Sequence, residues 1–231
     1  TTVETFTVPT DVSEITIEVW GAGGAGGTAT TGAAGGGGSG AYSKLTLSGV
    51  SSGDEYSITV GKGGTPASGI SSEVNGGDSK VTDNTSNVIV LAKGGKSVSG
   101  INTASGADGG KATDGIGDIK LDGDNGSDSS GTDSGKGGNA PNAPNNPPNA
   151  GTGGSSVNVI DDSSGSDGNT PGGGGSGAAS NSGAIGGNGA KGRIDITFTE
   201  FKFIQTDDGD FDDSSNWNVN DVPSSGDNAA I

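Results

Sequence analysis

Two glycine runs adjoin apolar strand patterns, and these runs limit what kind of interior the chain can build. The segment EITIEVWGAGGAGG covers residues 14–27, and GAAGGGGSGAYSKLTL covers residues 32–47 with the strand pattern after the glycines. Glycine has no side chain and loses more backbone entropy on ordering than any other residue. The glycine runs therefore either stay unordered or pack main chain against main chain.

Main-chain packing has a known form, the left-handed extended helix with three residues per turn, a rise of about 3.1 Å per residue and no internal hydrogen bonds. The glycines at 21, 23, 24, 26, 27, 35–38 and 40 lack the strict third-residue period of collagen. A bundle of short polyglycine-II-like helices within one chain is the structured interpretation, and a flexible linker is the alternative. The strand patterns beside the glycine clusters favour the bundle.

Composition argues against a conventional core and against most enzyme chemistry. The chain has 231 residues, of which 50 are glycine and 27% are hydrophobic, and it has no Cys, Met or His. Main-chain hydrogen bonds must therefore contribute much of the stability. The usual general bases, thiol nucleophiles and thiolate metal sites are absent, as are phosphate-loop and serine-hydrolase motifs. We predict a non-enzymatic protein, with a glycan-hydrolysing carboxylate pair as the alternative.

The charge and hydropathy of the chain argue against nucleic acid and membrane as partners. The formal net charge is -17, and the only arginine is Arg193. No basic patch is available to displace counterions from a phosphate backbone, so nucleic acid is excluded as a partner. No apolar run approaches the roughly 20 residues of a membrane span, which indicates no membrane insertion.

Alternating apolar and polar residues predict a series of strands. The clearest are EITIEVW at 14–20 and KGRIDITFT at 191–199, and we expect the latter to complete a sandwich that begins at Val3. We expect the first strand to form a hairpin with residues 14–20. The predicted fold is all-β, an antiparallel β-sandwich combined with a layer of packed polyglycine-II helices and no α-helix. The further strands are predicted at 3–8, 41–47, 55–60, 87–93, 116–121 and 157–160.

The composition changes near residue 200. Residues 1–199 form the predicted glycine-rich domain, and residues 200–231 are Asp-rich with Phe203, Phe211 and Trp217. The second part predicts the start of a further β module that is incomplete here, so we expect the polypeptide to continue.

Two acidic clusters have the oxygen ligands that calcium prefers. Asp208, Asp210 and Asp212 alternate in one of them, but Asp213 stands where an EF-hand loop needs glycine. The other cluster is DGDNGSD, with Asp122, Asp124 and Asp128. A solvated turn is the alternative for both clusters, so the sequence predicts no cofactor other than a candidate calcium ion.

Trp20 lies at the end of the organising strand, directly before the glycines. A lone aromatic residue at a strand end is usually a packing residue. We therefore expect Trp20 to cap the glycine layer with Tyr42 as its cross-strand partner, and an oligomer contact is the alternative.

The order FTVPTDVSEITIEVWGAGGAGG, GGGGSGAYSKLTL, DEYSITVGKGG and GGNGAKGRIDITF resembles the glycine-rich domains of bacteriophage long-tail-fibre adhesins and of bacterial surface proteins. It is also similar to the extracellular glycine-rich domain of the anaplastic lymphoma kinase receptor family. The resemblance implies a β-sandwich joined to packed polyglycine-II helices, with receptor-contacting loops between the glycine runs. These loops correspond to residues 97–108, 123–134, 139–150, 161–170 and 178–183, and the site residues they suggest are Asn102, Asp128, Asn142, Asn145, Asp167 and Asn181.

The resemblance thus implies a structural and adhesive module of a phage tail fibre or virion appendage, which displays receptor-binding loops on a rigid scaffold. Its partners would be a host cell-surface receptor or glycan and other fibre or virion subunits, and we expect a homo-oligomer located in the virion. The alternative is a secreted bacterial or archaeal surface or filament protein, extracellular or cell-surface, because an acid-rich surface suits a saline exterior. An ice-binding protein is a third interpretation, but Thr28, Thr30 and Thr31 form no regular array.

Overall fold

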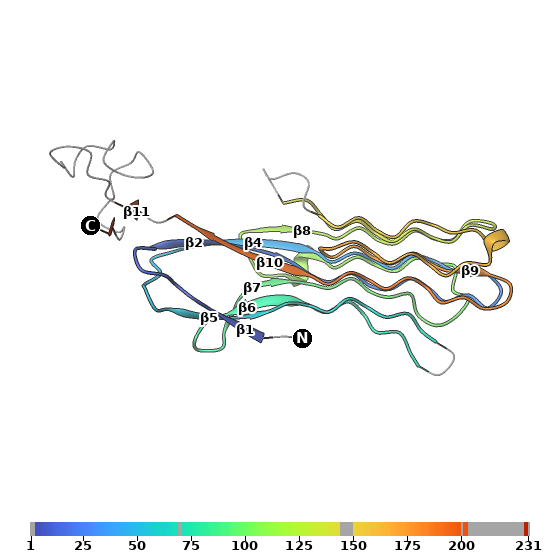
Figure 1. Cartoon of the computed structure of the whole chain (residues 1–231), viewed down its shortest axis with the longest axis horizontal. Helices are drawn as coiled ribbons and strands as arrows, with labels where there is room; N and C mark the ends of the chain where they lie inside the picture. The colour runs from blue at the N-terminus through green and yellow to red at the C-terminus, as the bar shows by residue number, and fades with distance from the viewer. Residues whose placement is uncertain (1–2, 69–70, 144–149, 200, 203–228, 231) are drawn as a thin grey trace.

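The computed structural model describes residues 3–68, 71–143, 150–199, 201–202 and 229–230. Figure 1 shows the strands gathered at one end of the described part of the molecule. Long extended segments lie side by side and continue from the strands to the other end. Within the described residues there is no α-helix; the helical elements are the two 3₁₀ turns η1 (Ala112–Asp114) and η2 (Val159–Asp161). The predicted all-β class is confirmed.

Two four-stranded antiparallel sheets form the sandwich. The first sheet has the order β1-β5-β6-β7 and the second has the order β10-β2-β4-β8. The strands of the first sheet are β1 (Val3–Thr7), β5 (Glu55–Thr59), β6 (Ser79–Thr82) and β7 (Val88–Ala92). Those of the second sheet are β10 (Arg193–Phe198), β2 (Glu14–Trp20), β4 (Tyr42–Ser48) and β8 (Ile119–Leu121).

The hydrophobic core lies between the sheets and depends on the alternation in β2. Ile15, Ile17 and Val19 are all 0% exposed, as the period of two predicts. From the other sheet Val81 and Val90 pack into the same cluster. Each buried aliphatic side chain contributes about 1.5–3 kcal/mol relative to exposure, so this small core stabilises one end of the domain.

The strand pairing corrects one prediction and confirms another. β1 does not form a hairpin with β2; it pairs antiparallel with β5 in the opposite sheet, with Phe6 opposite Tyr56. The turn at 8–12 instead crosses between the sheets, because Val8 and Val12 are both buried in the core. β10 pairs along nearly the full length of β2, from Arg193 opposite Trp20 to Phe198 opposite Ile15, so β10 does complete the sandwich.

Beyond the strands, the main chain of residues 34–41 donates hydrogen bonds to three neighbouring segments in strict rotation. The amides of 34, 37 and 40 donate to the carbonyls of 178, 175 and 172; those of 35, 38 and 41 donate to 103, 96 and 93; and those of 36 and 39 donate to 127 and 124. A period of three residues is the defining feature of the polyglycine-II helix. The segments 21–27 and 173–178 show the same rotation, with the Ser97 hydroxyl as the acceptor for the Ala25 amide.

These three segments, 21–27, 34–41 and 172–178, form a central triad. Each donates hydrogen bonds to the other segments around it and accepts hydrogen bonds from others: Gly24 donates to Gly38, Gly37 donates to Gly175, and Gly175 donates to Gly24. A closed ring of segments surrounds the triad, and each ring segment bonds to its two ring neighbours. In ring order the segments are 61–65, 74–78, 93–98, 105–110, 122–128, 134–140, 151–155, 164–169 and 185–192. This is a hexagonal lattice of main chains.

Close approach explains why the triad is built of glycine. A Cβ added at Gly24 would overlap the carbonyl group of Lys96, and one added at Gly175 would overlap that of Gly187. Ala22, Ala25 and Ser39 are tolerated within the same segments and are fully buried. Strand β2 thus continues directly into the lattice (Figure 1), which confirms the predicted layer of packed polyglycine-II helices.

The structure differs from the sequence prediction at several short elements. Residues 157–160 do not form a strand, because the side chain of Asn158 accepts a hydrogen bond from the Ile160 amide and starts the turn η2, which ends at Asp162 with φ 49°. The strand predicted at 116–121 is shorter, β8 (Ile119–Leu121). The sequence did not indicate β6 or the short pair β3 (Gly32–Ala33) and β9 (Ala179–Ser180).

The Asp-rich second part lies almost wholly outside the described residues. Within it the structure describes β11 (Phe201–Lys202) and β12 (Ala229–Ala230), which pair in parallel. The boundary near residue 200 therefore stays a prediction.

Candidate functional site

The end of the lattice far from the sandwich gathers loops from distant parts of the sequence, and we call it the distal tip (Figure 1). Bridges tie the loops together: Thr28 with Ile101, Ala29 with Ala184, and Asp133 with Asn158. Beneath them lies a small cluster of buried alanines, Ala29, Ala34, Ala178 and Ala184. The loops of the distal tip are residues 28–33, 99–104, 129–133, 157–163 and 180–184.

Asn102 is one predicted site residue that lies in the distal tip, and it joins two of its loops. It is exposed and adopts a positive φ of 58°, which asparagine tolerates better than most residues. Its Oδ1 accepts hydrogen bonds from the amides of Thr30 at 2.7 Å and Thr31 at 3.2 Å, and its Nδ2 donates to the Thr30 hydroxyl at 2.7 Å. The 28–33 loop, which the resemblance did not suggest, is therefore part of this surface.

Asn181 is the second predicted residue in the distal tip, and Asp162 holds its loop. Oδ1 of Asp162 accepts from the amides of Asn181 at 2.9 Å and Ser182 at 3.3 Å. The hydroxyls of Ser180 and Ser182 also donate to this carboxylate. These hydrogen bonds, first those from Ser180 and Ser182, lower the pKa of Asp162 to about 2. Asp162 therefore stays ionised wherever the protein is folded in ordinary buffers.

This carboxylate makes the loop sensitive to acid. Because the folded-state pKa lies below the ordinary value near 3.9, the contribution of Asp162 to the ordering of loop 180–184 is complete above about pH 4 and is lost as the pH falls through about 2. We expect the amide chemical shifts of Asn181 and Ser182 to titrate in that window. In Asp162→Ala the same amides should be less protected at pH 7 and show no such titration; unchanged protection would contradict the role.

Asp128 and Asp167 lie on the side of the lattice, and both hold backbone amides. Asp128 Oδ1 accepts from the Gly106 amide at 2.8 Å, and Asp167 Oδ1 accepts from the Asn188 amide at 2.7 Å. Ring segments have amides that point away from the triad, where no further segment can accept them. A carboxylate or side-chain amide oxygen of an exposed residue on the next ring segment accepts the hydrogen bond from such an amide.

The clearest set of such acceptors is Asp122, Asn125 and Asp128. They accept from the amides of Ala112 at 2.6 Å, Gly109 at 2.9 Å and Gly106 at 2.8 Å, so both sides advance in steps of three residues. One face of a three-residue helix repeats at this interval. The same arrangement pairs Asp78 with Gly94 and Asn139 with Gly153. Much of the negative charge on the described ring segments is therefore structural.

Removing these three acceptors together tests that role. Each hydrogen bond is exposed, so water replaces part of it, and we expect the triple substitution Asp122→Ala, Asn125→Ala, Asp128→Ala to lower the free energy of unfolding by about 1–2 kcal/mol in total. Ser127→Ala is the matched control, since its exposed side chain lies on the same segment. Denaturant unfolding measures both, and equal effects in the two variants would contradict the role.

The remaining predicted residues are elsewhere or outside the described residues. Asn142 is exposed, but it lies in the 139–143 stretch that packs against Trp20, not in the distal tip. Asn145 and the candidate calcium ligands Asp208, Asp210 and Asp212 lie outside the described residues. In the second calcium candidate, the carboxylates of Asp122 and Asp128 accept backbone amides. Among the residues that the structure describes, no group of three His, Cys, Asp or Glu side chains is gathered to hold a metal.

Sequence reasoning missed several exposed residues of the distal tip. Thr31 is exposed, and Ile160 is 86% exposed beside Asp161. Across the distal tip loops there is no Lys or Arg. The only sequence signal for residues 28–33 is their position between two glycine runs, which does not by itself indicate an exposed loop. The surface combines hydroxyl, amide and carboxylate groups with isolated aliphatic side chains.

The family comparison agrees with this architecture. The model of the glycine-rich domain matches residues 1–199, the span from the first strand to the end of β10. The chain therefore belongs to the glycine-rich domain family. No curated protein matches the sequence. In the described part of the chain, no helix is both long enough and apolar enough to cross a membrane.

Proposed function

We propose that this domain is a non-enzymatic structural and adhesive module of a phage tail fibre or similar virion appendage, and that its distal tip contacts a receptor or glycan on the host cell surface. The observation that supports this most is the polarity of the fold. The loops of the distal tip lie at one end, whereas β10, a strand of the sandwich, ends at Phe198 at the other end (Figure 1). Such a domain presents its loops away from the chain that follows.

The lattice supports this function by its rigidity. Each loop of the distal tip begins and ends in a segment whose amides are bonded within the lattice, such as Ala34 to Ala178 and Ala178 to Gly27. Fixed loop ends reduce the conformational entropy that is lost on binding. Loops on a rigid scaffold also change in sequence without disturbing the frame.

The chemistry of the distal tip suits a hydroxyl-rich ligand. Thr30, Thr31, Asn102 and Asn181 present neutral donors and acceptors, all on exposed residues. The exposed aliphatic Ile160 adds a small apolar contact. Neutral polar groups beside an apolar side chain fit a glycan, and copies of the domain in a fibre homo-oligomer would present several such surfaces at once.

A binding experiment with matched variants tests the proposal. The fluorescently labelled protein is titrated on a panel of bacterial cells and on an array of surface glycans. We expect the distal tip variant Thr31→Ala, Asn181→Ala, Ile160→Ala to lose at least tenfold in affinity while its melting temperature is unchanged. The control Lys136→Ala, Ser155→Ala changes exposed residues on the side of the lattice and should bind as the parent does.

Two results would contradict the proposal. Equal binding by the distal tip variant and the parent would place the contact elsewhere, and binding to no cell or glycan would remove the adhesive role. Tail or baseplate genes beside the coding sequence would further support the virion assignment, whereas a secretory leader in the full-length polypeptide would favour a cellular surface protein.

A further inference from the structure

A groove of about 440 Å³ lies where the sandwich meets the lattice, between β1 and β5 on one side and the start of β10 on the other. This is the side of the sandwich on which β1 and β10 are the edge strands of their sheets. The groove is far from the distal tip, and its volume falls within the usual range for small-ligand sites. Its lining includes Glu4, Ile58, Lys62, Thr170, Lys191 and Ile194.

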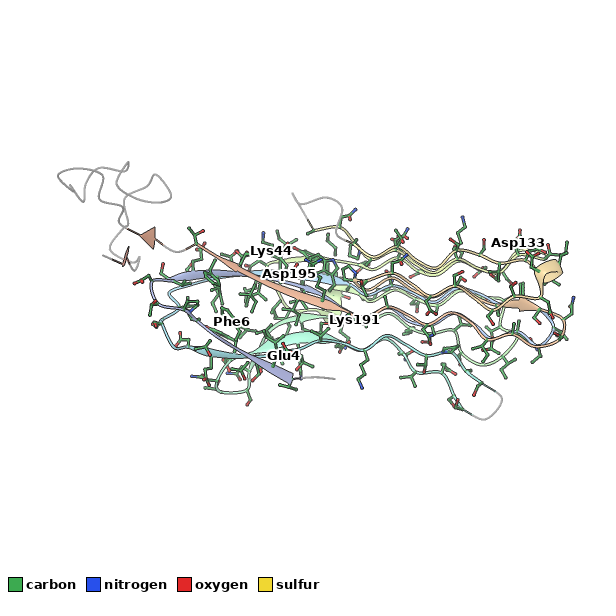
Figure 2. All side chains as sticks on the ribbon, in the orientation of Figure 1. Glu4, Phe6, Lys44, Asp133, Lys191 and Asp195 are labelled. Atoms are coloured by element: carbon green, nitrogen blue, oxygen red, sulfur yellow. The ribbon has the colours of Figure 1, made fainter. Side chains whose placement is uncertain are left out.

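Two exposed lysines that line this groove occupy paired positions on neighbouring ring segments because of the register of the lattice. The Gly192 amide donates to the Gly61 carbonyl at 3.0 Å, and the Gly189 amide donates to the Gly64 carbonyl at 3.0 Å. Both bonds join antiparallel segments in the same register, which pairs the backbone positions of Lys62 and Lys191. Figure 2 shows Lys191 just before β10 and Glu4 on β1, and both residues line the groove.

The charges of the groove are unusual for this chain. The net charge is -17 with only 11 Lys and Arg residues, yet Lys62, Lys191 and Arg193 all line one groove. Arg193 is already paired with Asp195 at 2.7 Å. Neither Lys62 nor Lys191 forms an ion pair with a described residue, and like charges on neighbouring segments repel. An anion between them would relieve that repulsion.

The other groups narrow the chemistry of the anion. Ile58, Val60 and Ile194 form an apolar wall, while Glu4 and the Thr170 hydroxyl supply acceptors. Sulfate has no donor for Glu4, hydrogenphosphate has a single hydroxyl, and neither anion has an apolar face to pack on this wall. A ligand that has one carboxylate, several hydroxyl donors and an apolar ring face satisfies all of these groups.

We propose that this groove binds a hexuronic acid residue of an acidic polysaccharide. The sugar carboxylate lies between the ammonium groups of Lys62 and Lys191, its hydroxyls donate to Glu4 and Thr170, and its C–H face packs on Ile58, Val60 and Ile194. This site is separate from the distal tip, so it does not rest on the function proposed for that surface.

The test is a calorimetric and NMR titration of the full chain with a trisaccharide of galacturonate or glucuronate. We expect saturable binding, with amide shift changes at residues 58–62 and 191–194, and at least a fivefold loss of affinity in Lys62→Gln and in Lys191→Gln. Lys136→Gln is the matched control, an exposed lysine on another ring segment. Raising the salt concentration should weaken the binding.

Competitor ligands distinguish the proposed chemistry from general anion attraction. The neutral trisaccharide of glucose and inorganic phosphate should each bind at least tenfold more weakly than the uronate. Equal binding of phosphate would mean an unspecific cationic patch and would overturn the proposal. No binding of uronate, or equal losses in Lys136→Gln and Lys191→Gln, would overturn it as well. Both lysines are exposed, so we expect each variant to remain folded, and its melting temperature checks this.

Discussion

Substituting Gly24 by alanine should unfold or severely destabilise the domain, with a loss of at least about 3 kcal/mol in the free energy of unfolding. The new methyl group would overlap the carbonyl carbon and oxygen of Lys96. Gly24 cannot move away, because its amide donates to Gly38 at 2.8 Å and its carbonyl accepts from Gly175 at 2.9 Å. Relief of the overlap therefore requires a shift of a whole central segment.

Ala25→Gly is the matched control in the next position of the same segment. It removes a buried methyl group and adds backbone freedom, so we expect a loss of only about 1–2 kcal/mol. Denaturant unfolding gives both values, and amide exchange shows where protection is lost. In Gly24→Ala, protection should fall in 34–41 and 172–178 as well as in 21–27. A loss confined to 21–27 would show that the segments are stabilised independently, contrary to a cooperative lattice.

The sequence predicted the parts of the fold in which side chains do the packing. Ile15, Ile17 and Val19 in β2 and Ile194 and Ile196 in β10 alternate, and the structure pairs these strands in one sheet. The same alternation could not reveal β6, because the four residues SKVT have one buried aliphatic, Val81. The alternation also does not assign strand partners, so the predicted hairpin of β1 with β2 is wrong and β1 pairs with β5.

The lattice was predictable at its centre and less so at its ring. The central runs at 21–27, 34–41 and 172–178 consist mostly of glycine, so the sequence alone marks them. Ring segments need glycine where they face the triad or press against a ring neighbour, as Gly109 does against Gly123, so only the outward position of each turn accepts Lys, Asp, Asn or Ser. Residues 105–110, SGADGG, therefore resemble a polar loop in sequence. The interval of three between Asp122, Asn125 and Asp128 was the available signal.

Because polar residues also occupy the outward positions of ring segments, the sequence predicted the site residues only in part. Among the expected residues, Asn102 and Asn181 lie together at the distal tip, while Asp128 and Asp167 hold amides along the side. A polar residue after a glycine pair has two possible positions, on a ring segment or in the loop beyond it. One sequence does not separate these two cases, because the length of each segment is set by its neighbours in the lattice.

Substituting Trp20 by alanine should have the second large effect, a loss of about 3–5 kcal/mol. The side chain is 0% exposed, its ring lies 5.0 Å from that of Tyr42, and its Nε1 donates to the Pro141 carbonyl at 3.0 Å. Ala140 and Ala143 pack against the same pair. Trp20 thus joins the outer face of β2 to a ring segment, as its position before the glycines predicted.

Trp20→Phe separates the packing from the hydrogen bond. Phenylalanine keeps an aromatic ring against Tyr42 but cannot donate to Pro141, so we expect it to cost about 1–2 kcal/mol. In both variants the Ala140 amide, which donates to Gly151 at 2.9 Å, should exchange faster, and more so in Trp20→Ala. If the two variants were equally stable, the aromatic pair would contribute little, and the sandwich and the lattice would be joined only by the strands that continue from one into the other.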